Sequence, residues 1–241
     1  MRTANPALND RAFAGVLAEP HGAEVMTVSG TVNKTLLSII IAFLAAAFVW
    51  SKPALASLSM PAAILGLVLA LIISFKQTWA PFLTPAYAAV EGVFLGAFSL
   101  FAEQFYPGIP AQAVGLTVAV TLCLLFAYKS GAIKATEKFK KGIFAATAGL
   151  ALFYLGAFIA QLCGVSLPFL TSSSPLSIGF SIVVVIIAAL NLVLDFDFIE
   201  QAANSRTAPK YLEWYAAFGL LVTLVWLYIE IVRLLMKTKR D

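Results

Sequence analysis

The sequence predicts an all-α membrane protein, built as a bundle of seven transmembrane helices. Of its 241 residues, 61% are hydrophobic and only 12% are charged, whereas an ordinary soluble domain is about 25% charged. One soluble core cannot bury this much apolar surface, but a membrane helix needs about 20 apolar residues and is surrounded by lipid. Seven such helices use about 140 residues. The composition therefore excludes a soluble globular protein.

The first three predicted helices follow a polar segment, residues 1–32, which we expect to be flexible and cytoplasmic. The apolar run 35–50 ends before Lys52 and Pro53, and the run 58–75 ends at a polar stretch that begins with Lys76. The third run, 84–105, is followed by Tyr106-Pro-Gly-Ile-Pro. Each break carries residues that end a helix, because proline removes a backbone donor and glycine favours turns.

Four more runs complete the predicted bundle, at residues 111–128, 142–163, 176–195 and 211–236. A basic stretch separates the first two of these runs, and a Thr-Ser-Ser-Ser-Pro sequence at 171–175 is typical of a helix start before the third. No fixed-period repeat marks a second domain. We therefore expect one transmembrane domain, residues 33–237, and a basic tail, residues 238–241.

The distribution of lysine and arginine predicts the orientation. The N-terminal segment and the loops after the second, fourth and sixth helices carry eleven basic residues, whereas the opposite loops carry only Lys52. Short cytoplasmic loops are enriched in such residues, so we expect a cytoplasmic N-terminus. An odd number of crossings, however, places the basic C-terminal end outside, and six crossings with one re-entrant run is the alternative. The eleven residues are Arg2, Arg11, Lys34, Lys76, Lys129, Lys134, Lys138, Lys140, Lys141, Arg206 and Lys210.

The sequence lacks the residues that several classes of function require. Cys123 and Cys163 stand alone in apolar runs and His21 is the only histidine, so we expect neither a disulfide nor a zinc site. We find no phosphate-binding loop and no nucleophile beside a base. We therefore expect no enzyme, no bound cofactor and no nucleic-acid partner.

Acidic residues within apolar runs are the candidate functional residues, because a carboxylate in hydrocarbon is costly. Glu91 lies in the third run beside Gly92 and Gly96, whose spacing allows close approach of another helix. Glu91 either makes an interhelical hydrogen bond or contributes to a pore or proton relay. The sequence is compatible with both hypotheses.

Asp195 and Asp197 end the sixth run. On a helix they lie about 200° apart, so they cannot face the same partner, whereas Asn191 shares a face with Asp195. We expect one of the two acids to point inward. The alternative is that both carboxylates are exposed to water at the end of the helix.

In the seventh run, Thr223, Trp226, Glu230 and Arg233 form one stripe at spacings of three, four and three. Glu230 and Arg233 are expected to pair. An ion pair near a helix end, with the arginine reaching the interface, is also a common structural device.

Three segments resemble the bacterial branch of the Bax inhibitor family. They are the acidic motif from Leu190 to Glu200, the Glu91-Gly92 segment, and the C-terminal run from Trp214 to Arg233. The resemblance covers residues from about Lys34 to Lys237. It implies a seven-helix bundle with a central last helix, and activity as a pH-sensitive calcium leak.

The resemblance also implies roles for individual residues. In the family, an aspartate at the end of the sixth helix bonds to another in the seventh and gates a pore by sharing protons. Asp195 matches the first position, but Thr223 stands where the second aspartate is expected. Glu230, Glu91 or Asp197 are possible substitutes, and Lys76 is the nearest match to a basic latch after the second helix.

Our leading hypothesis is a cation channel in which proton uptake by Asp195 breaks a closing interaction. The expected partners are the bilayer, protons and permeant calcium, which Asp195 would bind weakly with carbonyl oxygens. The alternative is an interaction protein that binds and restrains another membrane protein, such as a quality-control protease. In that case residues 1–32 would fold onto the partner.

Overall fold

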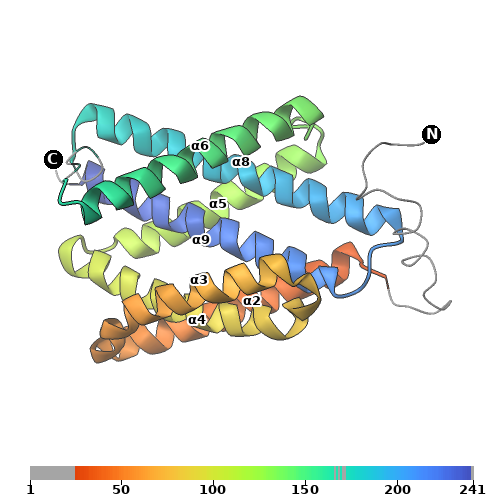
Figure 1. Cartoon of the computed structure of the whole chain (residues 1–241), viewed down its shortest axis with the longest axis horizontal. Helices are drawn as coiled ribbons and strands as arrows, with labels where there is room; N and C mark the ends of the chain where they lie inside the picture. Colours follow the sequence, from red (N-terminus) through yellow and green to blue (C-terminus); the bar gives the residue numbers. More distant parts are fainter. Residues whose placement is uncertain (1–24, 166, 168, 170–171, 240–241) are drawn as a thin grey trace.

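The computed structural model of the chain is helical, and it describes residues 25–239 except 166, 168, 170 and 171. Within these residues, seven helices are long and apolar enough to cross a membrane, and they form one bundle (Figure 1). The predicted all-α fold with seven candidate spans is therefore confirmed. The helices are α2 (Val28–Ser51), α3 (Ser59–Phe75), α4 (Ala80–Phe105), α5 (Ile109–Lys129), α6 (Glu137–Leu162), α8 (Pro175–Ser205) and α9 (Leu212–Thr238), with short 3-10 helices η2 (Pro53–Leu58) and η3 (Gln77–Trp79).

Helix α9 runs between two groups of helices (Figure 1). It packs against α2 and α4 on one side and against α5 and α8 on the other, while α3 packs on α4 and α6 packs on α8. Its buried residues include Ala217, Leu227 and Val232, which are shielded by these neighbours. The family resemblance also predicts that the last helix is the central helix of the bundle, and this stays a prediction.

Both ends of the bundle are identified by contacts between distant segments. At one end, Met26 N–H donates to the Ala208 carbonyl at 2.8 Å, so the start of α2 lies on the α8–α9 connection. Thr84, near the start of α4, donates to the Trp214 carbonyl at 3.2 Å. At the other end, Lys239 donates to the Pro107 carbonyl at 2.8 Å. Met26 and Lys239 therefore lie at opposite ends of the bundle.

Four predicted helix boundaries differ by a turn or more, and in each case the helix is longer than predicted: α4 and α6 begin four and five residues early, and the two largest differences are in α2 and α8. Helix α2 begins seven residues before the predicted start at residue 35, and α8 continues ten residues beyond the predicted end at residue 195. The errors at α2 and α8 arose because polar residues near the helix ends were interpreted as loop residues. In the structure these residues have partners in the bundle and remain helical. Residues 28–32, predicted to be flexible, belong to α2, whereas the rest of that predicted segment up to residue 24 lies outside the described residues.

Local sequence explains where the helices start. The side chains of Thr27, Thr136 and Ser174 each accept a hydrogen bond from a backbone N–H of the first turn, as N-cap residues do. Ser174 belongs to the Thr-Ser-Ser-Ser-Pro sequence that predicts this helix start. Before α5, Gly108 adopts a φ of 85°, a left-handed conformation that glycine reaches without strain.

Helices α2 and α4 approach each other at two glycines. A Cβ atom added at Gly92 would overlap with the Ala42 carbonyl oxygen and would lie 2.8 Å from the Cα atom of Ala42. A Cβ atom at Gly96 would lie 2.7 Å from the Ala46 carbonyl oxygen. The predicted small-residue face of α4 therefore lies directly against the backbone of α2.

Candidate functional site

Asp195 lies deep within α8 rather than at its end. The helix continues for ten residues to Ser205, which at 1.5 Å per residue places Asp195 about 15 Å from the end of the helix. The predicted helix end at Asp195 is therefore wrong, whereas the depth of Asp195 in the membrane stays a prediction.

The carboxyl group of Asp195 on α8 lies beside Thr223 on α9. Its Oδ2 atom is buried and has no hydrogen-bond partner among the described residues. Thr223 is itself buried, and its hydroxyl group lies 3.2 Å from the Gly219 carbonyl, to which it donates. The structure thus brings together Asp195 and the residue that stands in place of the family's second aspartate.

Asn191, one turn from Asp195, attaches the neighbouring helix α6. Its side-chain amide donates to the Thr147 hydroxyl at 2.9 Å and to the Ile187 carbonyl at 2.8 Å. This hydrogen bond is one of the polar connections between α6 and α8.

Asp197 points to different helices, as its angular distance from Asp195 predicts. One carboxylate oxygen lies 2.7 Å from Lys140 of α6 and accepts a hydrogen bond from Gln201 at 2.6 Å. Tyr128 of α5 donates to Glu200 at 2.5 Å and lies 3.4 Å from Asp197. These contacts join α5, α6 and the last turns of α8. They explain why the helix continues past its acidic motif.

Glu230 does not lie beside Asp195 but in a second polar cluster two turns farther along α9. It is buried, and its carboxylate lies 3.3 Å from Arg233, as their spacing predicts. Tyr154 of α6 donates to the same oxygen at 3.3 Å. The partners of Glu230 are therefore Arg233 and Tyr154, and not Asp195.

Glu91 and Lys76 lie elsewhere in the bundle. The buried Glu91 contacts Tyr87 one turn earlier and packs against α3, where a Cβ atom at Gly66 would lie 2.9 Å from Glu91 Oε2. The ammonium group of Lys76 lies 4.6 Å from the centre of the Trp79 ring. A latch role for Lys76 stays a prediction.

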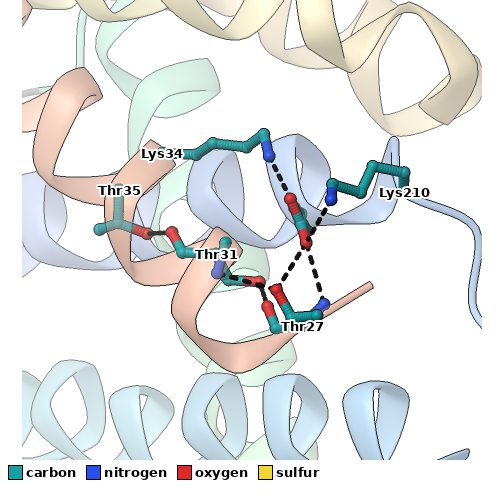
Figure 2. Close-up of polar contacts among 7 residues, drawn as sticks. Thr27, Thr31, Lys34, Thr35 and Lys210 are labelled. Carbon is teal, nitrogen blue, oxygen red and sulfur yellow. Dashed lines mark hydrogen bonds and ion pairs between the residues drawn. The ribbon is translucent and has the colours of Figure 1, made fainter. Parts of the chain in front are cut away.

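Among the residues that the structure describes, the carboxylate with the most polar partners is Glu213, which the sequence did not single out. Glu213, in the first turn of α9, has no solvent-exposed surface. It accepts hydrogen bonds from the backbone N–H and the hydroxyl group of Thr27, both at 2.9 Å, and from Lys34 of α2. Lys210 lies 3.9 Å away. Figure 2 shows Thr27, Lys34 and Lys210 pointing toward this carboxylate.

Glu213 escaped prediction because its position fits an ordinary expectation. A carboxylate in the first turn of a helix is favoured by the helix dipole alone, so its sequence context raises no question. Its partners lie 179 and 186 residues earlier in the chain. A usable signal was that Lys34 and Glu213 both adjoin apolar runs at the same predicted end of the bundle.

The described residues contain no group of three or more histidine, cysteine, aspartate or glutamate side chains arranged to hold a metal ion. The weak calcium ligation proposed for Asp195 from the sequence would use this carboxylate with carbonyl oxygens, as Ca²⁺ sites commonly do.

Comparison with protein families finds a match along essentially the whole chain. The family model is described as Bax inhibitor 1 like, and it matches residues 5–240. Comparisons with curated proteins and with solved structures find no match.

Proposed function

Because the chain belongs to the Bax inhibitor 1 like family, we propose that it is a pH-sensitive cation leak channel, permeable to calcium and gated by proton uptake at Asp195. The observation that carries this proposal is the contact between Asp195 of α8 and Thr223 of α9, where a carboxylate oxygen is buried without a partner. We further propose a bacterial inner membrane and a cytoplasmic N-terminus, which the basic residues favour.

Thr223 supplies a two-state contact because its hydroxyl group has a single proton and two acceptors. One acceptor is the Gly219 carbonyl, at 3.2 Å, and the other that we propose is the neighbouring carboxylate of Asp195. An ionised carboxylate competes strongly for this proton, because hydrogen bonds to charged groups are about twice as strong as neutral ones. Proton uptake removes that advantage and returns the hydroxyl proton to Gly219. The contact that holds α8 to α9 then weakens, and we expect the flux to rise as the pH falls.

Calcium flux into proteoliposomes across a pH series tests this proposal. The wild-type protein is expected to show greater flux at acidic than at neutral pH, whereas Asp195→Asn is expected to show the same raised flux at every pH because a carboxamide does not titrate. Asp197→Asn is the matched control, since Asp197 faces Lys140 and Gln201 instead. If Asp195→Asn retains the native pH response, Asp195 is not the sensor. If the wild-type protein carries no flux at any pH, the interaction protein becomes the better hypothesis.

Thr223→Val tests the partner of Asp195 separately. Valine has nearly the same shape but cannot donate a hydrogen bond, so the closing contact is lost while the carboxyl group remains. We expect raised flux at neutral pH, measured in the same assay. Thr121→Val is the control, because the Thr121 hydroxyl group donates to the Thr117 carbonyl within α5. A wild-type flux at neutral pH for Thr223→Val would contradict the two-acceptor arrangement.

A further inference from the structure

A cavity of about 1080 Å³ lies at the end of the bundle where α9 ends. It is lined by residues of α4, α6, α8 and α9, including Phe101, Phe158 and Phe180. Ligand pockets in proteins are commonly about 300–1,000 Å³, so the volume suits a sizeable molecule. Phe101 and Phe158 are also exposed on the outer surface of the bundle. The cavity therefore has apolar walls that continue onto the lipid-facing surface.

Three charged side chains of α9 line the same cavity: Glu230, Arg233 and Lys237. One carboxylate and two cations give a formal charge of +1. Arg233 lies 3.3 Å from Glu230 and its side chain is 48% exposed. Glu230 also accepts a hydrogen bond from Tyr154 at 3.3 Å. Glu230 can balance only one of the two cations, and Arg233 is adjacent to it.

Lys237 carries the positive charge that exceeds the negative charge of the cavity. The residue is only 9% exposed, and its ammonium group donates to the Ser181 hydroxyl at 2.8 Å. A hydroxyl group carries no charge, and it satisfies one of three ammonium donors. Glu230 attracts Lys237 but is shared with Arg233, so one positive charge stays unbalanced. Burying a charge is costly without a counter-ion. The cavity thus presents a buried cation that an anion would complete.

The position of these groups identifies the anion. Arg233 and Lys237 lie in the last two turns of α9, where a span approaches the lipid headgroups and basic side chains reach their phosphates. A phosphodiester carries a single negative charge, which equals the excess charge of the cavity. The aromatic walls below it suit acyl chains. A phospholipid is an anion with an apolar body that is abundant at this depth of a membrane, and it matches both parts of the cavity.

We propose that this cavity binds one phospholipid of net negative charge, with its phosphodiester between Lys237 and Arg233 and its acyl chains against Phe101 and Phe158. The site is separate from the Asp195–Thr223 contact, so it holds whether or not the protein conducts calcium. Lys237 is the residue that determines headgroup selectivity.

Native mass spectrometry of the purified full-length protein tests the proposal, with phosphatidylglycerol as the probe. Lys237→Gln preserves the length and hydrogen-bonding capacity of the side chain but removes its charge, and we expect about tenfold weaker phosphatidylglycerol binding, in line with the loss of one hydrogen bond to a charged group. Lys237→Arg is expected to retain binding. Lys52→Gln is the matched control, because Lys52 lies at the end of α2 and its ammonium group contacts Phe48, away from the cavity.

Two further ligands distinguish the source of the phosphate. Phosphatidylcholine is expected to bind more weakly than phosphatidylglycerol, because its added ammonium group meets the same excess positive charge. Inorganic phosphate is not expected to displace the lipid, since it lacks the apolar body. If inorganic phosphate displaces the lipid, the proposal is wrong, and a soluble phosphate compound becomes the better candidate for the ligand. Equal losses for Lys237→Gln and Lys52→Gln, or unchanged binding in Lys237→Gln, would overturn the proposal.

Discussion

Replacement of Glu213 by alanine is expected to destabilise the protein by about 3 kcal/mol or more, because breaking a buried ion pair leaves its partner charge without compensation. Lys34 is only 19% exposed at its side chain and depends on this carboxylate. The same change leaves the backbone N–H and hydroxyl group of Thr27 without their acceptor. We expect the start of α2 to detach from α9.

Unfolding of the detergent-solubilised protein, followed by circular dichroism during heating, measures this effect. Glu213→Gln retains a carbonyl acceptor for Thr27 but not the charge, so an intermediate loss is expected. Glu137→Ala is the control: that carboxylate is 79% exposed beside Lys140, and exposed pairs contribute only about 0–1 kcal/mol. A melting temperature of Glu213→Ala equal to that of Glu137→Ala would show that the Glu213 contacts do not stabilise the bundle.

Gly92→Ala is expected to produce the second large loss of stability, about 1–3 kcal/mol, the usual effect of forcing an extra methyl group into a packed interface. The new Cβ atom meets the backbone of Ala42 and the Cβ atom of Ala45 on α2. Backbone atoms cannot rotate away as a side chain can. Helices α2 and α4 must therefore separate to accommodate the methyl group.

Gly115→Ala is the matched control for this prediction. Gly115 also lies in the interior of a helix, α5, but an added Cβ atom there meets nothing within 4 Å. Alanine is favoured over glycine in helices by up to about 1 kcal/mol, so we expect equal or greater stability. Thermal unfolding of both variants in the same detergent measures the contrast. Equal stability of the two variants would show that the close approach at Gly92 is unimportant.

Hydropathy and helix-breaking residues predicted the bundle well because membrane helices must satisfy their own backbone hydrogen bonds. The boundaries of α3 and α5 lie within two residues of the predicted ones. The end of α8 was mispredicted because Asp197 and Glu200 read as the start of a loop. Their partners, Lys140 and Tyr128, come from helices that only the folded chain places beside them.

The candidate site was predictable only in part. Helical geometry predicted that Asp195 and Asp197 face different neighbours, and the resemblance aligned Thr223 with the position that faces Asp195. Neither Glu213 nor the cavity at Lys237 followed from the sequence. Both depend on pairs of side chains far apart in the chain, such as Lys237 and Ser181, and periodicity along one helix carries no information about such pairs.

The bond between Lys34 and Glu213 also constrains the order of assembly during synthesis. The ribosome delivers Lys34 to the membrane well before Glu213, which lies 179 residues later. Until the final helix is inserted, the lysine remains at the interface without its carboxylate. The contact between the start of α2 and α9 therefore forms only after α9 has been synthesised, whereas α2 can pack on α4 earlier.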